Sequence, residues 1–161
     1  MEYRYISSPI GDLLLAGSND ILQIIGFPQG KGVITPGNDW QEGTTIFSEV
    51  EDQLGEYFDG RRQKFDFKMK ASGTPFQLSV LDALLKIPFG HTTTYLQIAT
   101  LIGRPKAMRA VGAANGRNPL PIVIPCHRVI GADGSLTGFG GGLDAKAFLL
   151  NMESAEFALR A

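Results

Sequence analysis

Short apolar runs separated by polar turns dominate the first thirty residues. Met1–Ser8 alternates aromatic and polar side chains, and two apolar runs, Asp12–Ser18 and Ile21–Phe27, flank the dipeptide Asn19-Asp20. Period-two alternation is typical of half-buried strands, and a polar two-residue break between apolar runs is typical of a hairpin turn. We therefore predict a β-hairpin, followed by a loop over Pro28–Thr44, which is rich in glycine, proline and polar residues.

The next segment changes to a helical period. A helix is predicted over residues 45–58, ending at Gly60, because four apolar side chains recur at helical spacing: Phe47, Val50, Leu54 and Phe58. Phe65–Lys70 alternates again, which predicts a strand. The carboxylates here are scattered, so we expect a small α/β module with a solvated acidic surface and no catalytic residue.

The pattern changes again at Ser72-Gly73, which predicts one domain over residues 1–71 and a second over residues 72–161. Thr74 is suited to cap a helix, because its hydroxyl can accept from a free backbone N–H of the first turn. Pro75 suits the first helical position, because the donor that proline lacks would be unused there. The second domain is therefore expected to begin with a helix.

Two shorter helices are predicted over residues 95–102, capped by Thr93 or Thr94, and over residues 105–114, with Gly103 between them. Two short helices around a glycine-containing turn form the helix-turn-helix pattern. The second helix carries many small residues: Ala107, Ala110, Gly112, Ala113 and Ala114. Small side chains allow either close approach to a ligand or close packing on a neighbouring helix, and spacing alone leaves both open.

The segment Pro119–Val129 holds the single cysteine of the chain, Cys126, beside His127, and it contains three prolines. Proline restricts the backbone and removes a donor, so the segment is stiff and non-helical. Ile122-Val123-Ile124 predicts a buried strand or extended segment. The segment alone leaves Cys126 open to two interpretations, a reactive thiol or a small buried hydrophobic residue.

A glycine-rich loop over Gly131–Leu143 follows, and it lacks both the phosphate-loop and the dinucleotide-binding patterns. Leu143–Glu156 predicts a final helix, and its Glu153 is a candidate carboxylate partner for His127.

The composition excludes several classes of protein. The 161 residues, 43% hydrophobic and 19% charged, are those of a globular protein without a membrane-spanning run. One cysteine cannot form an internal disulfide, and the first residues lack a signal-peptide pattern, so we expect a cytoplasmic protein. One thiol and two histidines also argue against a structural zinc site.

Charge is distributed unevenly. Residues 1–82 carry seven basic and twelve acidic side chains, whereas residues 83–132 carry six basic ones and no acidic one. An acid-free stretch around the thiol indicates a surface that faces a polyanion, although a chance fluctuation is the alternative.

A cysteine attacks as a thiolate, so a nearby base must take its proton. Adjacent residues of an extended strand point to opposite faces, so we expect a water to bridge Cys126 and His127 unless the chain turns there. The resulting hypothesis is a Cys–water–His–Glu relay. Thiol hydrolysis, with the base drawn from a distant part of the chain, would have only His91 available and is less favoured.

Ile124-Pro-Cys-His-Arg-Val129, preceded by Arg109-Ala-Val-Gly112 and Arg117-Asn-Pro119, closely resembles the O6-methylguanine-DNA methyltransferase family. The likeness covers about residues 72–156 and includes further matching segments: Thr74-Pro-Phe-Gln77, Ile87-Pro-Phe-Gly90, Thr94-Tyr95, Gly141-Gly-Leu143 and Leu149-Leu150 with Glu153. Ser8-Pro-Ile-Gly11 resembles the family's amino-terminal domain more loosely.

The resemblance implies an α+β protein, in which a small N-terminal α/β (ribonuclease H-like) domain precedes a mostly helical C-terminal domain with a winged-helix-like helix-turn-helix. It implies DNA repair by direct reversal, with the alkyl group of O6-alkylguanine in duplex DNA moving irreversibly to Cys126. The base must be extruded first, because O6 lies inside the stack. We expect a monomer that acts on double-stranded DNA without a cofactor, a metal or a membrane.

Roles carried over by position follow from the resemblance. His127 and Glu153 form the relay, Asn118 holds the turn, and Tyr95 donates toward N3 of guanine. The expected DNA contacts are Arg109, which replaces the extruded base, with Tyr95, Lys106, Ala110, Gly112 and Arg117. The expected guanine pocket consists of the carbonyls of Cys126 and Val129 with Phe139, Gly140 and Gly141.

Two positions depart from the family. Gly140 stands where many members have serine, which leaves only the backbone N–H and affects lesion preference more than activity. Phe139 replaces a common tyrosine and should still wall the pocket. The alternative function is a non-enzymatic module that binds DNA lesions, because some relatives lack the cysteine. Cys126 argues against that class.

Overall fold

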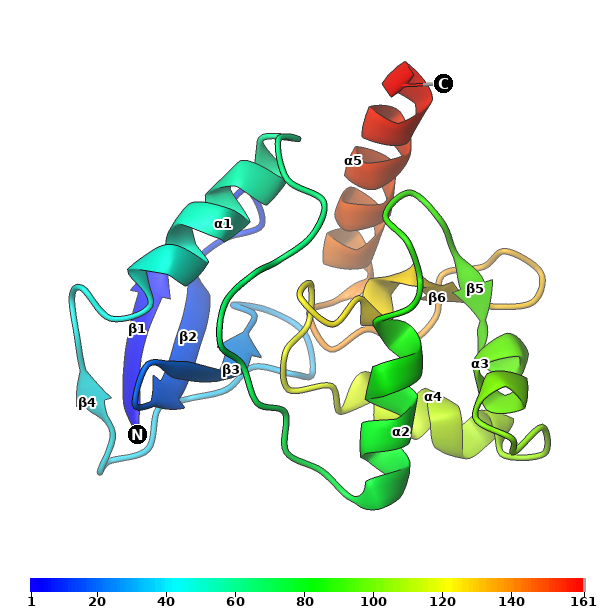
Figure 1. Ribbon diagram of the computed structural model, residues 1–161, viewed down its shortest axis with the longest axis horizontal. Helices are drawn as coiled ribbons and strands as arrows, with labels where there is room; N and C mark the ends of the chain where they lie inside the picture. Colours follow the sequence, from blue (N-terminus) through cyan, green and yellow to red (C-terminus); the bar gives the residue numbers. More distant parts are fainter. Residues whose placement is uncertain (161) are drawn as a thin grey trace.

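The computed structural model describes the backbone of residues 1–160 and the side chains of residues 1–154. The N-terminal part is a four-stranded sheet of order β3-β2-β1-β4 with α1 lying across it (Figure 1). Its elements are β1 (Glu2–Ile6), β2 (Leu13–Ser18), β3 (Ile21–Gly26), β4 (Gln41–Glu42) and α1 (Ser48–Phe58). The strands β1, β2 and β3 are antiparallel, and β4 adds a short parallel pair to β1.

The hairpin forms where the sequence predicts it. Asn19 and Asp20 have φ angles of 55° and 64°, and Ser18 pairs with Ile21 across the turn. Left-handed geometry at both central residues matches the twist of the strands, and short polar side chains tolerate it best. The hairpin prediction is confirmed.

The strand predicted over Phe65–Lys70 is wrong. The segment makes one bridge to β3, in which the Leu22 N–H donates to the Lys68 carbonyl and the Lys70 N–H donates to the Leu22 carbonyl. Its alternation has another cause, since Phe65 packs on Tyr57 and on Phe67 at centroid distances of 5.5 and 5.9 Å. The aromatic side chains are partly buried without a hydrogen-bonded ladder.

The C-terminal part is mostly helical (Figure 1). Its elements are α2 (Pro75–Leu84), β5 (Thr93–Thr94), α3 (Tyr95–Leu101), α4 (Met108–Gly116), the 3-10 turn η1 (Cys126–Arg128), β6 (Val129–Ile130) and α5 (Leu143–Arg160). Thr74 and Thr94 cap α2 and α3, each in a capping box with a glutamine three residues later. The helix-turn-helix is present, although α4 begins three residues later than predicted.

Ile122–Ile124 is buried as predicted, but it is not a strand. Ile122 has a φ of 73°, and the Ile124 N–H donates 2.8 Å to the Leu120 carbonyl, which closes a turn. Three prolines in the segment remove the donors that a strand would need, so the chain folds back on itself before η1.

A continuous apolar core joins the two parts. It runs from the sheet through α1 and α2 to α5, and includes Leu15, Leu54, Val80, Ile98 and Leu149. The edge of β3 also meets the C-terminal part, because the Ile25 N–H donates 2.9 Å to the Pro119 carbonyl. Within the part of the chain that the structure describes, no helix is long and apolar enough to cross a membrane.

The Thr74 cap gives a stability prediction. Thr74→Ala removes the acceptor for the Gln77 N–H and should lower the free energy of unfolding by about 1 kcal/mol in urea denaturation. Thr100→Ala is the matched control, since its hydroxyl only bonds back to Leu96 within α3 and its loss should change the value by less than about 0.5 kcal/mol. Equal effects of the two changes would contradict the capping role.

Candidate active site

The turn η1 brings the thiol and the imidazole into the interior. Cys126 is 3% exposed and His127 is fully buried. Because Cys126–Arg128 is a 3-10 turn, the two side chains are not on opposite faces of a strand, contrary to the extended geometry expected from the sequence. The chain therefore turns here, although no hydrogen bond joins the thiol to His127 Nδ1.

A buried carboxylate lies behind the imidazole. Glu153 is 1% exposed, and its Oε2 accepts from His127 Nε2 at 2.7 Å, which brings the predicted pair together. Arg128 donates from Nε to Oε1 at 2.8 Å and from Nη2 to Oε2 at 3.1 Å. Tyr57 donates its hydroxyl to Oε2 at 2.5 Å. Sequence reasoning did not predict Tyr57 or Arg128 in this site.

These contacts determine the state of the imidazole. Burial alone would raise the pKa of Glu153, but hydrogen bonds from His127 and Arg128 outweigh it and lower the pKa to about 2. Burial lowers the pKa of His127, so the ring is neutral at pH 7. Since Nε2 donates to the carboxylate, Nδ1 carries the lone pair, and no described protein group donates to it. His127 is therefore a buried base.

The thiol is held in its protonated form. Burial raises the pKa of Cys126 to about 11, although the hydrogen bond from Asn118 and the charge of Lys146 act in the opposite direction. Asn118 also donates 2.7 Å to the Ile124 carbonyl and accepts from the Leu120 N–H at 3.0 Å. Asn118 thus holds the turn around the thiol, as expected.

Two further residues contact the carbonyls expected in the guanine pocket. Lys146 is fully buried, and its Nζ donates 2.6 Å to the Val129 carbonyl and 2.8 Å to the Thr137 carbonyl. Asn115 donates from Nδ2 to the Cys126 carbonyl at 3.3 Å. Neither was predicted, because a lysine on an amphipathic helix and an asparagine near a helix end are usually solvated.

The N-terminal part lines the space beside the thiol with apolar residues and glycine. A cavity of about 40 Å³ lies against Cys126, and the residues that line it include Phe27, Ile34, Phe139 and Gly140. Phe27 and Phe139 stack edge-on with centroids 5.2 Å apart. A side chain at Gly141 would meet the Phe27 ring at 2.6 Å, which explains glycine there.

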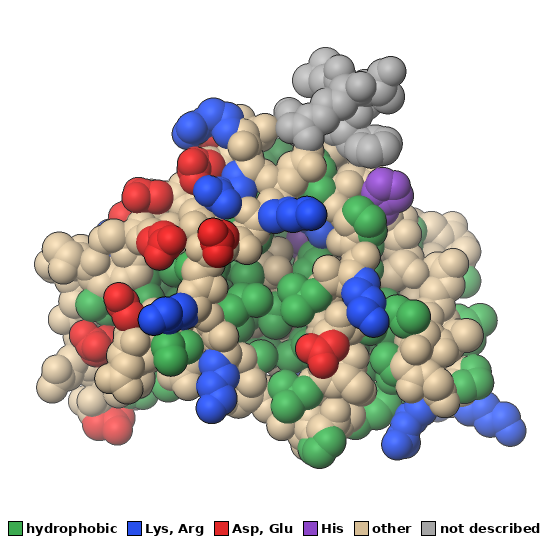
Figure 2. All heavy atoms as spheres, in the orientation of Figure 1, with side chains coloured by type: hydrophobic (Ala, Val, Ile, Leu, Met, Phe, Trp, Pro, Cys, Tyr) green, Lys and Arg blue, Asp and Glu red, His purple; other side chains and the backbone are tan. Residues whose placement is uncertain are grey.

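The helix-turn-helix presents most of the other predicted residues to solvent. Four of them are exposed: Lys106, Arg109, Ala110 and Arg117. Gly112 is half-buried, and a Cβ added there would lie 3.8 Å from the Tyr95 ring. Figure 2 shows the acidic side chains gathered mostly over the N-terminal part of the molecule. The acid-free face of α3 and α4 is therefore a basic surface.

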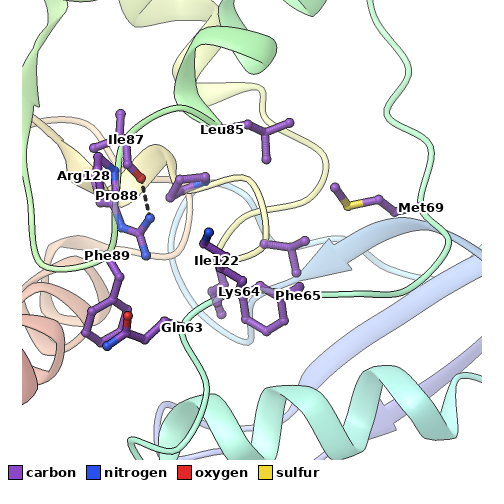
Figure 3. Close-up of a pocket in the computed structure, with 12 residues that line it drawn as sticks. Gln63, Lys64, Phe65, Met69, Leu85, Ile87, Pro88, Phe89, Ile122 and Arg128 are labelled. Carbon is purple, nitrogen blue, oxygen red and sulfur yellow. Dashed lines mark hydrogen bonds between the residues drawn. The ribbon is translucent and has the colours of Figure 1, made fainter.

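Arg128 is a correction to the charge argument. It is one of the six basic residues of the acid-free stretch, yet it is 6% exposed and bound to Glu153. Its guanidinium lines a cavity of about 450 Å³, and Nη1 donates to the Ile87 carbonyl at 2.7 Å. Figure 3 shows this hydrogen bond among the residues that line the cavity. Arg128 therefore belongs to the site and not to the surface.

Among the described residues, no three His, Cys, Asp or Glu side chains gather in a way that could hold a metal ion. What the fold and the site define is a protein with a buried cysteine thiol, a buried histidine bonded to a carboxylate, and an adjacent basic helix-turn-helix.

Comparisons with known proteins agree with this class. Residues 1–71 match the family model of the 6-O-methylguanine DNA methyltransferase, ribonuclease-like domain, and residues 75–155 match that of the DNA binding domain. A methylated-DNA--protein-cysteine methyltransferase of Methanosarcina barkeri is 52% identical over 153 residues, which is 95% of this chain and 97% of that protein. The corresponding Bacillus subtilis protein, termed constitutive, is 42% identical over 96% of each chain.

Solved structures are equally similar. The structure of Mycobacterium tuberculosis OGT in complex with DNA has a TM-score of 0.91 and 46% identity, covering 97% of this chain and 94% of that one. A structure of the M. tuberculosis O6-methylguanine methyltransferase has a TM-score of 0.90 and 44% identity, covering 99% of both chains. The chain belongs to the 6-O-methylguanine DNA methyltransferase family.

The buried carboxylate gives a pH prediction. A carboxyl group whose pKa is lowered on folding stabilises the protein fully above its ordinary pKa, about 4.3, and loses that contribution as the pH falls toward 2. Glu153→Gln should therefore lower the free energy of unfolding by about 3 kcal/mol at pH 7, and the difference from wild type should shrink between about pH 4.5 and 2.

Glu56→Gln is the control, because the Glu56–Arg62 pair is half-buried and should contribute less than about 1 kcal/mol. Denaturant titrations at several pH values measure both differences. Parallel stability curves for wild type and Glu153→Gln would contradict the pH-dependent contribution.

Proposed function

We propose that this chain reverses DNA alkylation by transferring the alkyl group of O6-alkylguanine to the sulfur of Cys126. Family membership gives direct-reversal repair by a protein-cysteine methyltransferase as its activity. The observation that carries the assignment to Cys126 is the buried thiol beside a His127–Glu153 pair.

The thiol proton leaves toward His127 in this proposal. In the neutral ring, Nδ1 carries a free lone pair. One water between Nδ1 and the sulfur completes the relay. Glu153 remains ionised and stabilises the imidazolium that forms, since Arg128 holds it as a carboxylate. Because burial keeps the thiol protonated, the nucleophile is generated only when a reacting carbon is in place.

The transfer balances without a cofactor. A bond forms between sulfur and the alkyl carbon as the bond from that carbon to O6 breaks, and guanine leaves with the electron pair. Tyr95 supplies a proton to N3, which makes guanine a better leaving group, and the proton taken up by His127 returns through solvent to the phenolate. The product is a stable thioether on Cys126, so each molecule acts once.

Tyr95 is the first residue of α3, and its hydroxyl must leave the Thr137 carbonyl in order to donate to N3. Its hydroxyl donates to the Thr137 carbonyl at 3.3 Å and accepts from the Thr137 hydroxyl at 3.1 Å. The parallel pair of Thr94 with Ile130 holds the start of α3 against the end of the cysteine turn. A base that enters between α3 and the glycine-rich loop would reach both the Tyr95 hydroxyl and the cysteine turn.

The guanine pocket requires the carbonyls of Cys126 and Val129 to accept from the exocyclic amine. The Val129 carbonyl accepts from Lys146 and can accept a second hydrogen bond. The Cys126 carbonyl already accepts two, from Asn115 Nδ2 and from the Val129 N–H, so one of these must give way to the amine. The Gly140 N–H would face O6. A space of about 40 Å³ holds a water but not a purine, so Phe139 and Gly140 must shift to admit the base.

Duplex DNA is the partner in this proposal, bound by the acid-free helix-turn-helix. Ala110 and Gly112 would lie against the minor groove, Lys106 and Arg117 would contact phosphates, and Arg109 would fill the space of the extruded base. The proposal also divides the chain into a structural domain, residues 1–71, and a DNA-binding and transfer domain, residues 72–161. It includes a monomeric state and a cytoplasmic location.

The intact mass of the protein tests the transfer. After incubation with a duplex containing O6-methylguanine, the wild type should gain one methyl group and Cys126→Ser should gain none. Unchanged mass with tight lesion binding would instead support a lesion-binding module, and turnover without modification would indicate hydrolysis.

Arg109 gives a separate prediction. Arg109→Ala should slow repair of the duplex by at least about tenfold and leave the reaction with free O6-benzylguanine within about twofold, because base extrusion has a cost only in DNA. Rapid-quench kinetics on both substrates measure this. Arg61→Ala, which removes an exposed arginine of the N-terminal part, is the control. Equal losses on both substrates would remove the role of Arg109 in extrusion.

A further inference from the structure

Tyr57 connects the N-terminal part to the relay. It lies near the end of α1, is fully buried, and donates its hydroxyl to Glu153 Oε2. Its ring packs against Phe58, Phe65 and Phe89 at centroid distances of 5.3, 5.5 and 6.3 Å. The aromatic ring is thus fixed by packing, and the hydroxyl position follows from it.

The acceptor of this hydrogen bond is the important feature. Oε2 is the same oxygen that accepts from His127 Nε2, so the phenol and the imidazole share one atom. A donor on a carboxylate reduces the negative charge available to the other donors. Burial and the charge of Glu153 raise the pKa of Tyr57 well above 10, so the phenol remains a donor at any working pH.

We infer that Tyr57 is a positioning residue for alkyl transfer that acts through Glu153: its hydrogen bond reduces the negative charge of Oε2 and thereby how strongly His127 holds a proton. The inference rests on the proposed function, in which His127 takes the proton of Cys126. It also gives the N-terminal part a task in the reaction, in addition to lining the cavity beside the thiol.

Several charged or titratable groups surround His127 and Glu153. His127 is faced by Glu153 and Lys146 from α5, and by Arg128 and Cys126 from its own turn. His91, in the loop between α2 and β5, borders a cavity that also reaches Glu153. Among the described residues, Tyr57 is the group from the N-terminal part that bonds directly to this cluster.

Tyr57→Phe tests the inference because it removes the hydroxyl and keeps the ring. Oε2 then has more negative charge for His127, which stabilises the imidazolium. The pKa of His127 should rise by at least about 0.5 units. The acid limb of the pH–rate profile with free O6-benzylguanine should move to higher pH by the same amount, because transfer requires a neutral His127.

The chain has two histidines, so nitrogen NMR of the imidazole rings resolves His127 once His91→Asn has assigned the other. Tyr3→Phe is the matched control, since it removes a tyrosine–glutamate hydrogen bond to Glu42 on the exposed sheet. Its His127 titration and pH–rate profile should equal those of the wild type.

A second variant keeps the test decisive if Tyr57→Phe folds poorly. 3-Fluorotyrosine at position 57 is a stronger donor, so it should shift both measurements to lower pH. An unchanged His127 titration in a folded variant would overturn the inference. The failure of the proposed function is distinguishable, because it would appear as no mass gain in the wild type, whereas the titration needs no substrate.

Discussion

The carboxylate of Glu153 is the group on which the arrangement of this protein depends. A buried carboxylate is strongly destabilising unless its oxygens are hydrogen-bonded and its charge is paired. Here the two oxygens accept four hydrogen bonds from Tyr57, His127 and Arg128. These donors come from α1 and from the cysteine turn, whereas Glu153 lies on α5. One carboxylate therefore joins three segments that are far apart in the sequence, and it does so next to the cysteine turn.

The same burial explains why both the thiol and the neighbouring imidazole are neutral at rest. Desolvation raises the pKa of Cys126 and lowers that of His127, so both side chains are neutral at pH 7. A neutral pair is the cheaper state in a low-dielectric interior. Proton transfer between them creates two charges, and Glu153 stabilises the positive one. Lys146 lies close enough to favour the negative one. Burial outweighs both contributions, so the site rests in the neutral pair.

Local signals in the sequence predicted the local structure well. Asn19-Asp20 specifies its turn, and Thr74 and Thr94 specify helix starts, because in each case the deciding hydrogen bonds lie within four residues. Ile122 was misassigned, since a β-branched residue is strained at positive φ and only the folded surroundings hold it there. His127 and Glu153 could be paired from the family resemblance. Tyr57 could not, because an aromatic residue on a helix predicts core packing, and its hydroxyl partner lies 96 residues away.

The short pairing of β5 with β6 links DNA recognition to chemistry. Thr94 caps α3 and also pairs with Ile130, so the first turn of the helix-turn-helix is held in register with the residues that follow the cysteine turn. Tyr95 comes next in the chain and lies against Gly112 of α4. A movement of α3 and α4 on a duplex cannot then be independent of the thiol. Because backbone hydrogen bonds fix this register, the distance between the basic surface and Cys126 is a property of the fold and does not depend on flexible side chains.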